Sequence, residues 1–114
     1  MGIPRSVEPF PYLIDSADPH RTKTADLIAS EGYGELLGIA EKINTLSMLD
    51  ERMTEKGKAG NASYEWLRDL RQFGCVPHGG FGLGVERLIR WLLRIPHVRD
   101  TIPFPRVFGR RIYP

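Results

Sequence analysis

The sequence has little that would mark a secreted, membrane-bound or zinc-binding protein. Its 114 residues include one cysteine, Cys75, so no internal disulfide can form and a reducing, cytoplasmic location is expected. No apolar run approaches the ~18 residues that a membrane-spanning helix needs, and the N-terminus lacks a signal-peptide core. The three histidines are scattered, which does not suggest a zinc site. A net charge of +2 is too small to indicate nucleic acid as a partner by itself.

Glycine, in contrast, is concentrated in one stretch, at positions 79, 80, 82 and 84. An apolar set with helical spacing follows directly, at positions 85, 88, 89, 92 and 93. The stretch therefore predicts a glycine-rich strand that runs into an amphipathic helix over 84–94. It is not a P-loop, and its spacing fits a dinucleotide fingerprint poorly.

Such a junction can bind a ligand or can serve the fold alone. Glycines let a phosphate or a flat ligand lie against the backbone. The N-terminus of the helix and Arg87 in its first turn both favour an anion there. Glycine-rich strands also occur where a sheet bends or two backbones approach closely, and the pattern alone leaves both interpretations open.

The rest of the chain predicts an α+β fold, an antiparallel β-sheet flanked by helices. Strands are expected near 6–13, 22–29, 34–43 and 78–84, and helices over 45–57, 63–73 and 84–94. We expect the last helix to be the most buried element. If the chain is a piece of a larger domain, its antiparallel sheet is expected to have an exposed edge strand and an open core.

Local signals refine the two middle helices. Ser47 with Asp50 resembles an N-terminal capping box, and Gly57 is a stop signal. One face of the second helix is apolar and is expected to face the core, and Trp66 on that face is expected to be a core residue. Its arginines are expected to be surface charges. The apolar set on that side comprises Trp66, Leu67, Leu70 and Phe73.

In the expected strand over 34–43, side chains alternate between two faces. Glu35 and Glu41 share one face, and Gly38 and Lys42 share the other. Neither face is uniformly polar, so the alternation does not show which is buried. Because a charged group is costly to bury unless it is paired or metal-bound, a wet edge for Glu41 and Lys42 is the simpler interpretation.

The roles of the remaining reactive or charged side chains are not decided by the sequence pattern. His78 either lines a site or hydrogen-bonds backbone at the entrance of the glycine strand. Cys75 has no base beside it in sequence and is expected to be a small, half-buried residue. Arginines gather in the last third of the chain, where they form either a phosphate- or RNA-facing cluster or a solvated face.

The segment Gly80-Phe81-Gly82-Leu83-Gly84-Val85-Glu86-Arg87 resembles motif 3 of class II aminoacyl-tRNA synthetases. The flanking Pro77-His78-Gly79-Gly80 and Ile102-Pro103-Phe104-Pro105-Arg106 resemble the aspartyl/asparaginyl branch, and its asparaginyl members most. The resemblance extends back to about Pro4. It implies that residues 1–114 are the C-terminal part of a catalytic domain, without motif 1, motif 2 and the anticodon-binding domain. We therefore expect a truncation or a split gene product.

The resemblance implies an ATP-dependent aminoacyl-tRNA ligase of protein biosynthesis. ATP and asparagine or aspartate would form an aminoacyl-adenylate, and the acyl group would pass to tRNA. Implied cofactors are ATP and Mg²⁺. Implied partners are the amino acid, tRNA through the full-length protein, and a second copy of the parent enzyme in a homodimer, with no membrane partner.

The resemblance implies a set of residues that bind ATP. Glu35 matches a glutamate that holds Mg²⁺, and Arg87 matches an arginine that binds the γ-phosphate of ATP, so these two are the expected catalytic residues. The backbone of Gly84, Val85 and Glu86 is expected beside the adenosine end of ATP.

The resemblance also implies a set of residues that bind the substrate amino acid, namely Gly38, Lys42 and Gly80. Lys42 stands where the family has arginine, so it keeps the charge but loses the planar fork. Ile39 stands where a second glycine is usual and adds bulk next to the expected pocket. Alternatives therefore include an aspartyl enzyme, a tRNA-independent paralogue that uses the same ATP and amino-acid site, and a non-catalytic fragment that serves as an interaction module.

Overall fold

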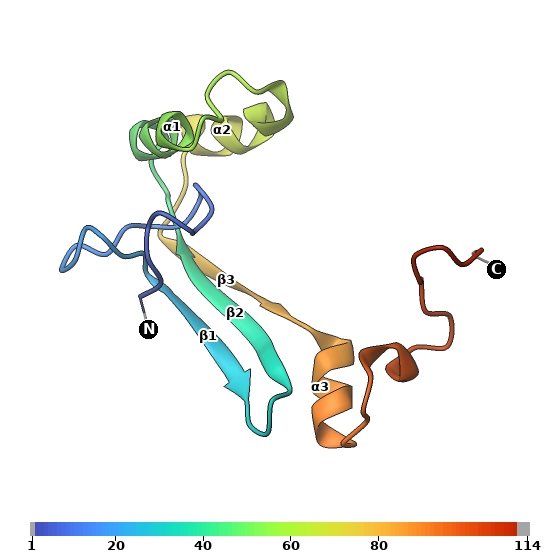
Figure 1. Ribbon diagram of the computed structural model, residues 1–114. Coiled ribbons are helices and arrows are strands. Elements are labelled where there is room, and N and C mark those ends of the chain that lie inside the picture. Colours follow the sequence, from blue (N-terminus) through green and yellow to red (C-terminus); the bar gives the residue numbers. More distant parts are fainter. Residues whose placement is uncertain (1, 112–114) are drawn as a thin grey trace. The chain divides into compact units, whose positions relative to one another are not determined.

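The computed structural model describes residues 2–111. Three strands, β1 (Thr24–Ala29), β2 (Gly34–Lys42) and β3 (His78–Leu83), form one antiparallel sheet in the order β1-β2-β3. The helices are α1 (Leu46–Glu55), α2 (Glu65–Gln72) and α3 (Val85–Leu92), with short 3₁₀ turns η1 (Ala62–Tyr64) and η2 (Val98–Thr101). The predicted α+β class is confirmed (Figure 1). None of the helices within 2–111 is long and apolar enough to cross a bilayer.

The chain divides into two compact units. The first contains the residues up to Ala25 and Ile39–Phe81, and the second contains Asp26–Gly38 and the residues from Gly82 onward. Each strand of the sheet contributes to both units, because the boundaries fall within β1, β2 and β3.

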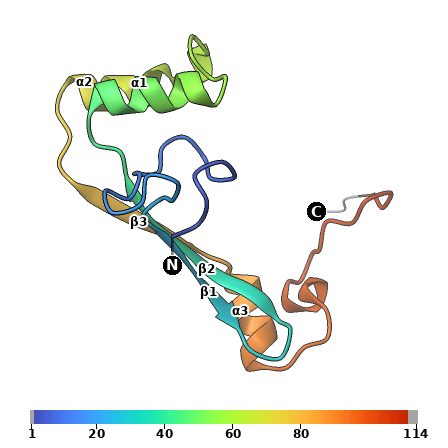
Figure 2. The same cartoon turned by 60° about the vertical axis from the view of Figure 1, so that its left-hand side comes forward.

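The core of the first unit lies between α1 and the chain on either side of it. It consists of Phe10, Ile43, Leu49 and Met53, each at most 8% exposed. Helices α1 and α2 lie side by side in both views (Figures 1 and 2). Helix α1 ends as expected at Gly57, whose positive φ of 63° allows the Lys58 N–H to donate to the Met53 carbonyl at 2.7 Å.

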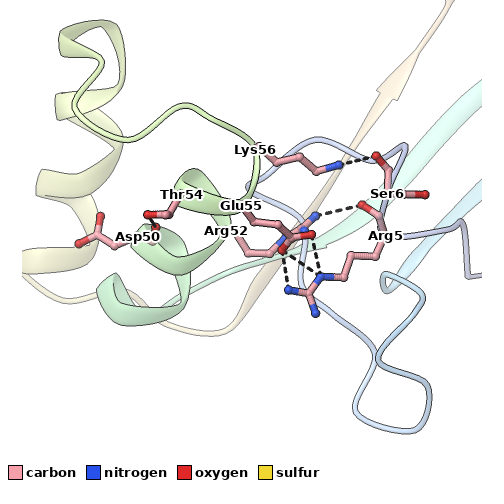
Figure 3. Close-up of polar contacts among 7 residues, drawn as sticks. All are labelled: Arg5, Ser6, Asp50, Arg52, Thr54, Glu55 and Lys56. Atoms are coloured by element: carbon pink, nitrogen blue, oxygen red, sulfur yellow. Dashed lines mark hydrogen bonds and ion pairs between the residues drawn. The ribbon is translucent and has the colours of Figure 1, made fainter.

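A charged cluster ties the N-terminal segment to α1 (Figure 3). The Arg5 Nε donates to both carboxylate oxygens of Glu55, at 3.0 and 3.1 Å, and Lys56 Nζ donates to the Ser6 carbonyl. Arg52 is only 1% exposed, and its Nη1 lies 2.6 Å from Glu55 Oε2. A single carboxylate therefore pairs with two guanidinium groups, one of them buried.

The expected strand over 6–13 does not form. Within 6–13 the structure has a single isolated antiparallel bridge, Tyr12↔Lys42, and further isolated bridges lie on either side, at Pro4↔Arg21 and Ile14↔Thr22. Pro9 and Pro11 have no N–H to donate, so a continuous ladder is interrupted at every second residue.

Three expectations for the middle helices are also wrong. The N-cap of α1 is Thr45, not Ser47, and it makes no side-chain cap bond, while both carboxylate oxygens of Asp50 accept from Arg68. Arg71 is 8% exposed, and its Nε donates to the Ile43 carbonyl at 3.0 Å, so it is a buried residue and no surface charge. Trp66 is 61% exposed and is no core residue of the described chain.

Helix α3, in the second unit, is not the most buried element. It contains no buried residue, and Val85 and Leu92 are 54% and 64% exposed. An apolar helix face is buried only where another element covers it, and within the described residues α3 packs chiefly against η2. The helix ends at Leu92, with Arg94 in the left-handed region (φ 53°) in the place that glycine often takes.

The Glu55 cluster predicts an acid-sensitive first unit. Hydrogen bonds from Arg5, and then from Arg52, lower the pKa of Glu55 from 4.5 to about 2. A depressed folded-state pKa stabilises the fold above pH 4.5, and this stabilisation is lost as the pH falls through 4.5 toward 2. Because Glu55 is one-third exposed, water screens the pair, and we expect Glu55→Gln to cost about 1–2 kcal/mol at pH 7 and far less near pH 2.

Urea unfolding at pH 7, 4 and 2.5 measures this difference. Glu86→Gln is the control, since Glu86 is an exposed carboxylate on α3, outside the Glu55 cluster. Equal destabilisation by Glu55→Gln at all three pH values would show that the cluster does not act through ionised Glu55.

Candidate functional site

The glycine strand joins α3 at a fixed backbone corner in the second unit. The Gly84 N–H donates to the Leu36 carbonyl of β2 at 2.9 Å, and the Gly84 carbonyl accepts the first helical bond from Leu88 at 2.9 Å. Gly84 is the N-cap of α3 and receives no side-chain cap bond. The backbone N–H groups of residues 85–87 precede that first helical bond, which leaves the positive end of the helix facing outward for an anion.

Arg87 is held at this corner by two contacts. Its Nη1 donates to the carbonyl oxygen of Glu35 at 2.9 Å. Its aliphatic stem covers Gly84 so closely that an added Cβ there would lie 3.2 Å from Arg87 Cδ. Gly84 has an ordinary φ of −75°, so lack of space, and not backbone freedom, makes glycine suitable.

Two carboxylates converge on Gly38, also in the second unit. A Cβ built on Gly38 would lie 3.2 Å from Glu35 Oε1 and 3.5 Å from Asp26 Oδ1. Both acidic residues are exposed. Asp26 was missed by the sequence reasoning. An acidic residue directly before the apolar run of β1 was the available signal, but only the pairing of β1 with β2 brings it to Glu35.

These two carboxylates supply hard oxygen donors, which suit Mg²⁺. Among residues 2–111 there is no group of three or more His, Cys, Asp or Glu side chains that could hold a metal ion. The pair fits an ion that takes its remaining ligands from phosphate and water, as Mg²⁺ usually does.

Lys42 belongs to the first unit and lies on the same face of β2 as Ala40, which is 4% exposed. Its Nζ lies 3.9 Å from the centre of the Tyr12 ring, a cation–π contact. Burial and the nearby Arg71 charge lower the pKa of Lys42, and Glu8 partly opposes them. The expectation of a wet edge therefore fails for Lys42, which is half-buried.

A hollow of about 470 Å³ lies beside Lys42 in the first unit. Its polar lining comes from Lys42, Arg71 and His78, and its apolar lining includes Phe10 and Trp66. Gly80 lies next to this lysine, since a Cβ there would be 4.0 Å from Lys42 Cε. The structure thus brings Gly80 and Lys42 together. It adds His78, for which lining a site was one of two expected roles, and Arg71, which was expected to be a surface charge.

His78 hydrogen-bonds backbone, which was one of its two expected roles. Its Nδ1 lies 2.9 Å from the Val76 carbonyl and is therefore the protonated nitrogen, leaving Nε2 to face Arg71 Nη2 at 3.5 Å. Cys75 is half-buried, as expected, and its Sγ lies 3.5 Å from the same Nδ1.

Ile39 points elsewhere. It is 45% exposed and lines a separate hollow of about 340 Å³ together with Thr24 and Lys23. Residues 39 and 42 are on opposite faces of the pleated strand, so the bulk of Ile39 is not added to the hollow beside Lys42.

Comparison with known proteins agrees with this architecture. Residues 1–108 match the family described as tRNA synthetases class II (D, K and N). An asparagine–tRNA ligase of Desulforamulus reducens is 44% identical over 111 residues, which are 97% of this chain and 25% of that protein. One of Pyrococcus abyssi is 44% identical over 113 residues, which are 99% of this chain and 26% of that protein.

Solved structures give the same result. The crystal structure of asparaginyl-tRNA synthetase from Pyrococcus horikoshii complexed with asparaginyl-adenylate matches with a TM-score of 0.91 at 40% identity, over 98% of this chain and 26% of that one. An aspartyl-tRNA synthetase from Entamoeba histolytica matches with a TM-score of 0.88 at 29% identity, over 98% of this chain and 22% of that one. The chain belongs to the class II tRNA synthetases. It spans about a quarter of the length of the relatives it matches.

The close packing of Arg87 on Gly84 predicts a matched pair of variants. Gly84→Ala should displace the Arg87 side chain from the Glu35 carbonyl, because the new methyl would lie 3.2 Å from Cδ. Gly82→Ala should not, because nothing lies within 4 Å of a Cβ there. If Arg87 holds a phosphate of Mg·ATP at this corner, Gly84→Ala should weaken that binding about tenfold through loss of one charge-assisted contact, as measured by calorimetry. Equal affinities of the two variants for Mg·ATP would show that packing against Gly84 does not fix the position of the Arg87 side chain.

Proposed function

We propose that this chain provides the motif 3 side of an asparaginyl-type active site and binds Mg·ATP at the corner between β2 and α3. The observation that carries the proposal is the Arg87 guanidinium, which is exposed yet fixed by its bond to the Glu35 carbonyl. It lies at the N-terminus of a helix whose first N–H groups precede the helical bonds. A fixed cation beside a positive helix end favours a phosphate group.

Glu35 and Asp26 are the residues that would hold Mg²⁺, through their carboxylates around Gly38. When bound, the ion would neutralise charge on the phosphates of ATP. A side chain at position 38 would approach both carboxylates within about 3.5 Å, so glycine keeps the space between them open.

Arg87 would bind the γ-phosphate, with the backbone of Gly84, Val85 and Glu86 beside the adenosine end. In the proposed first step, a carboxylate oxygen of the amino acid attacks the α-phosphorus of ATP. The bond from that phosphorus to the bridging oxygen breaks, and pyrophosphate leaves with the electron pair. This in-line displacement depends on positioning and charge neutralisation more than on covalent help from the protein.

In the first unit, Lys42 would attract the substrate amino acid, with Gly80 leaving room beside it. Asparagine is the proposed substrate, since the Pyrococcus horikoshii relative is complexed with asparaginyl-adenylate, and aspartate is the alternative. The acyl group would then pass to tRNA in the full-length protein, acting in the cytoplasm as a homodimer. Residues 1–114 are proposed to be the C-terminal part of its catalytic domain.

One observation favours a second candidate. A lysine at position 42 lacks the fork that grips a carboxylate in two places, which fits a paralogue that adenylates an amino acid without using tRNA. Amino-acid-dependent pyrophosphate exchange without any transfer to tRNA, in the full-length protein, would identify it. A chain that binds no ATP would instead fit the non-catalytic fragment.

Calorimetric titration of Mg·ATP into the 114-residue chain tests the first proposal. We expect binding with an affinity of about 1 mM, and its loss in Arg87→Ala, because the γ-phosphate would lose its cation. Arg99→Ala is the matched control, since Arg99 is an exposed arginine on η2 and has no bond to Glu35 in the described contacts. An equal loss of ATP affinity in both variants would show that positive charge in general, and not the placement of Arg87, attracts the nucleotide.

The carboxylate pair predicts a separate Mg²⁺ effect. Asp26→Asn and Glu35→Gln should each raise the Mg²⁺ concentration that half-saturates ATP binding, by about tenfold for one lost ionic ligand. Asp69→Asn, an exposed acidic residue on α2, serves as the control. An unchanged Mg²⁺ requirement in both site variants would remove these carboxylates from the proposal.

A further inference from the structure

Tyr12 occupies a fixed position although its segment forms no regular strand. It makes an antiparallel bridge with Lys42, and the residues on either side are bonded to β2 or to the chain just after it. The Leu13 N–H donates to the Glu41 carbonyl and the Ile43 N–H donates to the Pro11 carbonyl, each at 2.9 Å. The ring is therefore carried on backbone that is bonded on both sides of it.

The flexible, partly desolvated side chain of Lys42 would be held in place by an aromatic ring beside it. Lysine is a point charge on a flexible four-carbon stem, so it does not fix its own direction as a planar guanidinium does. The Arg71 guanidinium repels it, and burial removes part of its hydration. The face of an aromatic ring offers a cation an attraction that survives partial burial, and the Lys42 Nζ lies 3.9 Å from the ring centre of Tyr12.

We propose that Tyr12 is a positioning residue that holds the Lys42 ammonium at the hollow beside Arg71 and His78, so that the direction of this charge is fixed although lysine has no planar fork. The inference rests on the proposed role of Lys42 in binding the substrate amino acid. It assigns Tyr12 no contact with the substrate.

Anchoring of the segment supports this role. Arg5 and Ser6 are tied to Glu55 and Lys56 of the α1 end (Figure 3), and Phe10 is part of the core with its ring 4.9 Å from that of Tyr64. Tyr12 follows Phe10 by two residues. Its ring therefore belongs to a segment with one anchor in the charged cluster and another in the core.

The first measurement concerns Lys42 alone and needs no ligand. In the 114-residue chain labelled with ¹³C-lysine, a ring facing the ammonium shifts the Lys42 Hε signals upfield of those of Lys23, whose Nζ pairs with Glu41 at 3.1 Å. Tyr12→Leu should move the Lys42 signals to the Lys23 position, and Tyr12→Phe, which keeps a ring, should leave them shifted. The pKa of Lys42, which burial and Arg71 lower and Glu8 raises, should fall further in Tyr12→Leu because an attraction to the charged form is lost.

The second measurement titrates L-asparagine, and separately L-aspartate, into the same proteins and follows the Lys42 signals. We expect the affinity for the amino acid that binds to fall about two- to fivefold in Tyr12→Leu and to stay unchanged in Tyr12→Phe. Lys42→Met should lose binding altogether. An unfolded Tyr12→Leu sample would be recognised from the Lys23 signals, and Tyr12→Met, an unbranched and more adaptable replacement of similar volume, then takes its place.

The outcomes separate the two ideas. Lys42 signals that do not respond to Tyr12→Leu, or an affinity unchanged in Tyr12→Leu but lost in Lys42→Met, would overturn the positioning role. Unchanged affinity in Lys42→Met, or absence of amino-acid binding to the wild-type chain, would overturn the proposed role of Lys42 in substrate binding. In that second case the positioning role toward substrate falls with it, while the ring shift still decides whether Tyr12 holds the ammonium.

Discussion

The pleat of β2 is the constraint on which the other features depend. Successive side chains of a strand point to opposite faces, and β2 is paired along both edges, so its register cannot slip without moving every side chain to the wrong face. Leu36 and Ala40 are buried, whereas Glu35 and Ile39 are exposed. The same alternation puts Lys42 with the buried set, and this placement accounts for its partial desolvation.

Charge is handled differently in the two units. In the first, each buried guanidinium meets an oxygen: Arg71 donates to the Ile43 carbonyl, and Arg52 lies against Glu55. A buried guanidinium without a hydrogen-bond acceptor would be costly, so these contacts come with the core. In the second unit Arg87 is exposed and bonded only to a backbone carbonyl in the described contacts, which leaves its charge available to a ligand.

Local sequence signals predicted well wherever a short stretch decides the outcome. Strands near 22–29, 34–43 and 78–84 and the three helices form close to their expected bounds, and Gly57 and Gly84 flank helices as expected. Signals failed where a distant residue competes. Asp50 is taken from its cap position by Arg68, and the segment 6–13 has too few free N–H groups between its prolines to become a strand. Burial of α3 was overestimated because an apolar stripe tells which face would be buried but not whether anything covers it.

The sequence by itself determined the family, the α+β class and the glycine-to-helix junction with Arg87, because a long motif and local backbone preferences are contained in contiguous residues. Only the tertiary structure decided three further features. Pairing of β1 with β2 brings Asp26 to Glu35 around Gly38, the fold of the N-terminal segment lays Tyr12 against Lys42, and α2 carries Arg71 into the same hollow. Each of these contacts joins residues that are separated along the chain, so their distance depends on strand register and helix packing, which no local pattern specifies.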